Sequence, residues 1–184
     1  NGVANSLLSN ANLLKKVYFP RLHIPLALVI SNLGQYFLNL AVFVGFYVYF
    51  LVFTQADVQP SGYLLLLPLL IIQCAAVGLG VGLWLSALTT KYQDLRFALP
   101  FLAQLWMFAT PIIYSADVVV TPKWRVLLAL NPMSGIIEVN RFAFLGSGFV
   151  ETGFLVTSFL SGMVTLVTGL LLFNRVQRTF ADTI

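Results

Sequence analysis

The fold class is decided by one uncharged stretch, residues 62–90, which reads GYLLLLPLLIIQCAAVGLGVGLWLSALTT. A transmembrane helix needs about 20 mostly apolar residues, and this stretch exceeds that length without a single Lys, Arg, Asp or Glu. Residues 22–56, 97–116 and 153–174 are three further stretches without these residues. The four stretches predict an all-α integral membrane protein with four transmembrane helices.

The composition of the whole chain agrees with this prediction. Of 184 residues, 59% are hydrophobic and 9% are charged, against roughly 25% charged in an ordinary soluble domain. A soluble domain of this size needs more charge to cover its surface. The composition therefore excludes a soluble enzyme and a nucleic-acid-binding module, and it predicts membrane lipids as neighbours. The net charge of +4 is expected to reflect basic residues gathered on one membrane face.

Residues 126–145 admit two interpretations. Asn131-Pro132 breaks their apolar pattern, and Glu138 and Arg141 fall in their second half. They are either a fifth span or two short helices that enter the membrane and return. Non-helical backbone at membrane depth survives only where protein or water satisfies its polar groups.

The distribution of basic residues favours the second interpretation. With four spans, one side receives Lys15, Lys16, Arg21, Lys91, Arg96, Arg175 and Arg178, and the other receives Lys123, Arg125 and Arg141. Basic residues near spans prefer the cytoplasm, so both ends of this chain are expected to be cytoplasmic. Residues 122–149 are then an outer re-entrant helical hairpin. Its marked residues are Trp124, Asn131, Pro132, Glu138 and Arg141.

Small residues recur every four positions in the second span, at Cys74, Gly78, Gly82 and Ser86. Such a face predicts close packing against another span. Cys74 is the one cysteine and His23 the one histidine of the chain, so we expect no metal site and no cofactor bound by this chain. The four spans hold no Asp or Glu, which argues against ion-coupled transport.

One face of residues 97–116 combines aromatic and neutral polar side chains, at Phe97, Phe101, Gln104, Phe108, Pro111 and Ser115. These groups suit the flat faces and hydroxyls of a sugar without trapping it, and they suit packing against another helix equally well. Both interpretations stay open. A second aromatic group, at the outer end of the first span, is typical of an interfacial belt. It comprises Phe46, Tyr47, Tyr49, Phe50 and Phe53.

Five ordered segments carry a family resemblance. They are LLKKVYFPR at residues 13–21, YQDLR at 92–96 with its continuation to 106, TPIIY at 110–114, the PKW, LNPM and IIE…R pattern within 122–141, and the tail from 173 to 184. Together they resemble the membrane permease subunit of type-2 ABC exporters for polysaccharides and polyol phosphates, such as O-antigen, capsule or teichoic acid. Gln93 is a departure, because the family usually has Arg there.

The resemblance implies six spans in the full chain, with an amphipathic helix and two spans before this point. Residues 1–184 are then one transmembrane permease domain of a bacterial or archaeal cytoplasmic membrane. The working unit is two permeases and two separate ATP-binding subunits, which hold ATP and Mg and drive a lipid-linked glycan outward. The segment before the first span would dock the ATP-binding subunit through Leu14, Lys15, Lys16, Tyr18, Phe19 and Arg21. The alternative for this basic patch is an anchor on anionic lipid.

Two other functions remain open. The same scaffold could export a drug or another small lipid-like substrate. An integral-membrane enzyme of glycan or lipid assembly would need a catalytic acid or metal cluster. The outward acidic residues are scattered, at Asp57, Asp117, Glu138 and Glu151.

Overall fold

The computed structural model describes residues 23–53, 60–92, 94–118 and 122–181, and every regular element in these ranges is a helix. Three helical stretches within them are long and apolar enough to cross a membrane. They lie in α3 (His23–Phe53), in η1 (Gly62–Leu66) with α4 (Leu67–Lys91), and in α8 (Thr152–Ala181). The shorter helices are α5 (Leu95–Ala109), η2 (Ala116–Val118), α6 (Pro122–Leu130) and α7 (Pro132–Leu145). The predicted all-α membrane fold is confirmed.

Helix α5 is shorter than the span expected at residues 97–116, because it ends at Ala109. Pro111 disfavours helical backbone at the residue before it, and Thr110 is extended, with φ −104° and ψ 138°. Fifteen helical residues span about 22 Å at roughly 1.5 Å per residue, less than the roughly 30 Å of a hydrocarbon core. The chain therefore continues beyond α5 as an irregular segment rather than as helix.

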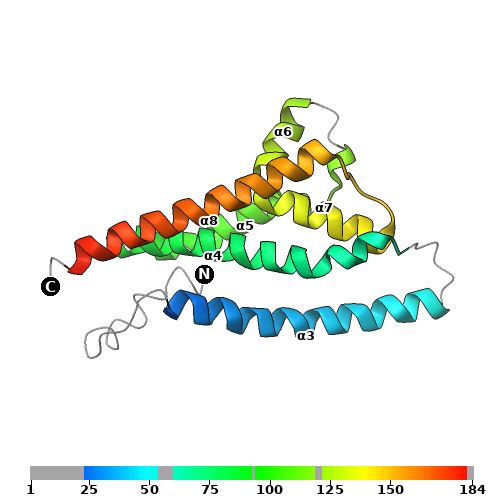
Figure 1. The fold of residues 1–184 in the computed structure, drawn as a ribbon, viewed down its shortest axis with the longest axis horizontal. Helices are drawn as coiled ribbons and strands as arrows, with labels where there is room; N and C mark the ends of the chain where they lie inside the picture. The colour runs from blue at the N-terminus through cyan, green and yellow to red at the C-terminus, as the bar shows by residue number, and fades with distance from the viewer. Residues whose placement is uncertain (1–22, 54–59, 93, 119–121, 182–184) are drawn as a thin grey trace.

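Helices α4 and α8 form the closest helix pair, and they lie side by side in Figure 1. Their contact is built on glycine: a Cβ placed on Gly80 would lie 2.7 Å from the Cα of Leu166. Gly162 of α8, four residues before Leu166, packs against Val77 of α4, which is 3% exposed. Small residues permit this approach of two backbones in lipid.

The predicted face of small residues is displaced from this contact. A Cβ on Gly78 would meet nothing within 4 Å, whereas Gly80, two residues further along, is the glycine that α8 covers. Gly82 and Ser86 are buried, so that part of the face does pack. The four-residue spacing identified the helix correctly and misplaced the closest approach by about half a turn.

The α6–α7 hairpin lies near the start of α8, at the opposite end of the molecule from the C-terminus of α8 (Figure 1). Ile136 and Val139 of α7 pack with Leu70 and Val77 of α4 in a buried cluster. A smaller cluster joins α6 to the first turn of α8 through Ala129 and Phe154. The hairpin is thus seated on the α4–α8 pair.

Helix α3 runs along α4 (Figure 1), and its C-terminal half contacts α7 through Tyr47. The hydroxyl of Tyr47 donates to the carbonyl oxygen of Phe144 at 2.6 Å, and both rings meet edge to face. Tyr47 therefore contacts α7, unlike the other members of the aromatic group, and its place in an interfacial belt stays a prediction. The other members of that group are exposed, as a belt requires: Phe46, Tyr49, Phe50 and Phe53.

Candidate functional site

The candidate site is the irregular chain that follows α5, residues 110–116, here named the break segment. It runs from the end of α5 to Ala116, the first residue of η2, and lacks helical hydrogen bonding over most of its length. Backbone polar groups removed from water need partners. Here the partners are three side chains, one at the N-terminal cap of α7 and two within α7. They determine the geometry of the site.

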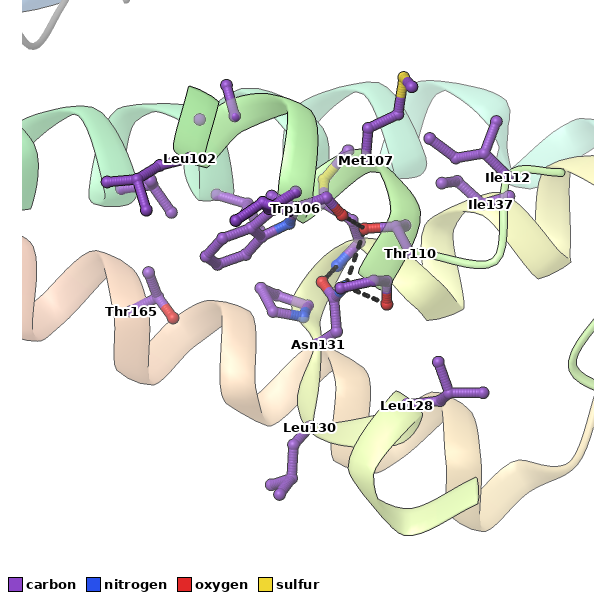
Figure 2. A pocket seen from close by; sticks show the side chains of 18 of the residues that line it. Leu102, Trp106, Met107, Thr110, Ile112, Leu128, Leu130, Asn131, Ile137 and Thr165 are labelled. Carbon is purple, nitrogen blue, oxygen red and sulfur yellow. Dashed lines mark hydrogen bonds between the residues drawn. The ribbon is translucent and has the colours of Figure 1, made fainter. Parts of the chain in front are cut away.

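Asn131 is the first of these residues and sits between α6 and α7. It has extended backbone, and its side-chain oxygen accepts from the backbone N–H of Met133 at 3.1 Å, so it caps α7. Its amide nitrogen donates to Thr110 Oγ1 at 2.8 Å and to the carbonyl oxygen of Ala109 at 3.3 Å. Figure 2 shows Asn131 and Thr110 facing each other with these bonds dashed. One side chain therefore starts α7 and holds the end of α5.

Arg141 is the second residue, and its guanidinium makes four hydrogen bonds. Nη2 donates to the carbonyl oxygens of Pro111 at 3.0 Å and Ile112 at 2.9 Å. Nη1 donates to the carbonyl oxygen of Tyr114 at 3.1 Å and to Glu138 Oε1 at 2.7 Å. The planar fork of arginine suits several acceptors at once, which a lysine ammonium does not match. Arg141 thereby satisfies three carbonyls that no helix can satisfy.

Glu138 is the third residue and is fully buried. Its Oε1 accepts from the backbone N–H of Ala116 at 2.9 Å as well as from Arg141, and its Oε2 accepts from the N–H of Phe149 at 2.9 Å. A buried carboxylate is tolerated only when it is paired and hydrogen-bonded. Glu138 meets both conditions, and it joins the break segment to the turn after α7.

Gly148 belongs to that turn and is required by the position of Glu138. Its φ is +154°, and a Cβ there would lie 3.3 Å from Glu138 Oε2 and 3.2 Å from the Glu138 carbonyl oxygen. Only glycine adopts such backbone without strain. The turn therefore approaches the carboxylate closely because residue 148 has no side chain.

A cavity of about 1280 Å³ lies beside these contacts, between α5 on one side and α4, α8 and the hairpin on the other. Its walls are mostly apolar and include Leu102, Trp106, Leu128 and Ile137, with Thr165 on α8 (Figure 2). Thr110 and Asn131 supply polar groups to its lining. This is the composition of a site for a largely apolar ligand.

The comparison with protein families agrees with the fold. The sequence profile described as ABC-2 type transporter matches residues 1–145, which include α3, α4, α5 and the whole hairpin. This chain belongs to the ABC-2 type transporter family.

Relatives of this ABC-2 transporter chain carry a more specific name. Two proteins from Klebsiella pneumoniae, each named O-antigen export system permease protein RfbA, are 26% identical to it over 179 and 177 residues. A Myxococcus xanthus protein of the same name is 29% identical over 145 residues. The matches cover 96% of this chain for the Klebsiella proteins and 78% for the Myxococcus protein. The chain spans 66% of the length of the Klebsiella proteins and 53% of the Myxococcus protein.

The expected path residues of this ABC-2 transporter chain are not gathered into one enclosed site. Four of them are exposed on α5 and do not line the cavity: Phe97, Phe101, Gln104 and Phe108. The other two belong to the break segment, where Pro111 is buried and Ser115 is half-buried. Their role as a path stays a prediction. The expected docking residues, Leu14 to Arg21, lie outside the described residues.

The expected hairpin residues are brought together more closely. Trp124, Asn131 and Pro132 line the cavity, and Glu138 and Arg141 form an ion pair. Sequence reasoning missed their partners, above all Gly148 and Ser158. Ser158 is buried on α8, and its hydroxyl accepts from the N–H of Gly135 at 3.0 Å. The one available signal was the three-residue spacing of Glu138 and Arg141, which places opposite charges on one helix face.

Proposed function

We propose that this chain is the permease subunit of an ATP-driven exporter that moves a lipid-linked polysaccharide or polyol-phosphate polymer across the cytoplasmic membrane. The observation that carries the proposal is the similarity over 96% of the chain to proteins named O-antigen export permeases. The membership in the ABC-2 transporter family supports it. The order of long helices and hairpin also agrees with the order expected from that resemblance.

The proposal includes partners. A separate ABC ATP-binding subunit holds ATP and Mg, and this chain binds no cofactor and catalyses no reaction of its own. Two copies of the permease form the working unit. The family name supports an ATP-binding partner, and the many exposed apolar side chains of α3 and α5 support contact with lipid or with further transmembrane helices.

The proposed orientation places both ends of the chain in the cytoplasm of the inner membrane. Lys91 ends α4, Arg96 is the second residue of α5, and Arg175 lies near the end of α8. The end of α8 lies opposite the hairpin in Figure 1, and the hairpin carries Lys123 and Arg125. Because basic residues favour the cytoplasmic side, this arrangement supports a hairpin that enters the membrane from outside.

The polymer is proposed to pass along the exposed face of α5. Phe97, Phe101 and Phe108 present aromatic rings there, and Gln104 presents an amide. Rings and a neutral amide contact sugar without holding it by charge. A second permease facing this surface would enclose it as a channel.

A second candidate function follows from the cavity, whose lining is mostly apolar. A small lipid-like substrate would fit such a site better than a polar glycan. The same scaffold would then export a drug or lipid rather than a polymer. The two candidates differ in which face of α5 the substrate contacts.

The deciding experiment uses the full-length permease, expressed with a candidate ABC ATP-binding subunit from the same genome in a strain that lacks its own polymer exporter. Surface polymer is measured by immunoblotting of whole cells. We expect surface polymer and co-purification of the two subunits. An ATP-binding subunit unable to hydrolyse ATP is the control and should abolish export. Co-purification without surface polymer, together with extrusion of a lipophilic dye, would favour the second candidate.

A further inference from the structure

Helix α5 is held mainly at its C-terminal end, through the break segment that follows it. Within α5, Leu99 is the one buried residue, so the body of the helix has little packing to fix it. The break segment, in contrast, is bonded at almost every polar position. Asn131 binds Ala109 and Thr110, and Arg141 and Glu138 bind residues 111, 112, 114 and 116.

All of these bonds lead to one helix. Asn131 caps α7, and Glu138 and Arg141 lie one turn apart within it. Separation of the break segment from α7 would leave three of its carbonyls without the Arg141 donors and the backbone N–H of Ala116 without its acceptor on Glu138. Both are strongly unfavourable at membrane depth. The side chain of Arg141 is 18% exposed, so water could replace few of the lost bonds.

We propose that Glu138 and Arg141 are positioning residues of the export cycle, which hold the end of α5 on α7 so that α5 and the hairpin change position as one body. The inference rests on the proposed function, since it assigns these residues a part in transport. Glu138 extends the body to the turn after α7 through its bond to Phe149. Movement of α5 is thereby transmitted directly to the hairpin and to the start of α8.

The first test measures the fastening itself and does not depend on export. Ser115 is half-buried in the break segment, and Ser115→Cys in a Cys74→Ala background of the full-length permease supplies a label position. The rate of maleimide labelling is measured in lipid nanodiscs. Arg141→Lys and Glu138→Gln should each raise this rate about tenfold, because charge-assisted bonds of the fork are lost. Asn140→Ala, which removes an α7 side chain whose hydrogen bond goes to the carbonyl oxygen of Ile136 within the same helix, should leave the rate unchanged.

The second test asks whether the two parts move together. Thr110→Cys and Asn131→Cys place two thiols where the native side chains are 2.8 Å apart. In the permease assembled with its ATP-binding partner, the oxidised pair should export at the rate of the reduced pair. The disulfide should also restore export to the Arg141→Lys variant, because it fastens the same two parts covalently. Protein abundance and thermal stability are measured for every variant.

Three results would overturn the inference. Labelling rates of Arg141→Lys and Glu138→Gln equal to that of the parent would show that neither residue holds the segment. Failure of the two cysteines to form a disulfide would show that the segment and α7 do not stay in contact. Loss of export on oxidation would show that they must separate in each cycle. A parent complex that exports no polymer contradicts the proposed function instead. The labelling rates then still decide whether Glu138 and Arg141 hold the break segment on α7.

Discussion

Gly169 of α8 packs directly on Gly80 of α4, so that a side chain on Gly169 would overlap the carbonyl oxygen of Gly80. The Cδ1 of Trp84 lies 3.1 Å from the same Cβ position, and the Trp84 indole N–H donates to Thr168 Oγ1 at 3.1 Å. The glycine contact and the hydrogen bond thus occur within one turn of each other. They fix the crossing of the two helices on which the hairpin is seated.

Gly169→Ala is therefore expected to destabilise the permease. Overpacking of a closely packed interface costs about 1–3 kcal/mol, and Gly80→Ala should behave in the same way because Leu166 backbone blocks its Cβ. Gly78→Ala is the matched control, since nothing lies within 4 Å of its Cβ position. Thermal unfolding in detergent measures the effect. Equal unfolding temperatures for Gly169→Ala and Gly78→Ala would contradict the glycine contact.

Removal of the Glu138 carboxylate should be among the most damaging single changes. Glu138→Ala leaves the Arg141 guanidinium without its anion and two backbone donors without acceptors. Breaking a buried pair from one side costs about 3–5 kcal/mol. The double variant with Arg141→Met should cost less than the sum of the two single changes, as expected for coupled residues. Chemical denaturation of the four proteins checks this, and strict additivity would refute the coupling.

The proposed orientation predicts which loops an impermeant reagent reaches. Single cysteines at Ser61, Gln93 and Thr183 are introduced into a Cys74→Ala background. The cysteine at 61 should be labelled in sealed cells. The cysteines at 93 and 183 should be labelled only after permeabilisation, because the basic residues near them favour the cytoplasmic side. Labelling of the cysteine at 93 in sealed cells, without labelling at 61, would reverse the topology.

The segment before α3 is predicted to dock the ATP-binding subunit. Exchange of Lys15, Lys16 and Arg21 for Glu should reduce co-purification of that subunit while the permease remains inserted. Each exposed ion pair contributes about 0.2–1 kcal/mol, so the triple change is needed for a clear effect. If co-purification and export are unchanged, the patch serves as a lipid anchor.

The path prediction separates the two faces of α5. Phe108→Ala should alter polymer export, and Gln104→Leu should impair it, because both change the exposed face that is proposed to contact sugar. Leu102→Ala, which enlarges the cavity, should leave polymer export intact. Export is scored relative to permease abundance. Loss of export in Leu102→Ala alone would move the path to the cavity.

The spans could be predicted from the sequence because hydropathy and length are local properties. Residues 62–90 and 153–174 fall within helices, and the break at Asn131-Pro132 is the observed start of α7. The end of α5 at Ala109 could also have been predicted, since Pro111 carries that information. The prediction of a span that continues to residue 116 gave more weight to the apolar composition than to Pro111.

The partners of Glu138 and Arg141 could not be predicted. Their partners in the break segment lie 22 to 30 residues before them along the chain, and the N–H of Phe149 lies 11 residues after Glu138, so these bonds follow from tertiary packing. The same holds for Gly80, which the four-residue spacing excluded from the packing face. Only the position of α8 decides which glycine of α4 is covered.

The two bonds of the Glu138 carboxylate also set an order for biosynthesis. Oε1 accepts from the N–H of Ala116, which is synthesised before α7. Oε2 accepts from the N–H of Phe149, which is synthesised after α7. Until residue 149 has left the translocon, the hairpin carries a carboxylate that lacks one of its partners, and such a group resists entry into hydrocarbon. We therefore expect the hairpin to reach its final depth late, after the chain on both sides has emerged and together with the first turn of α8.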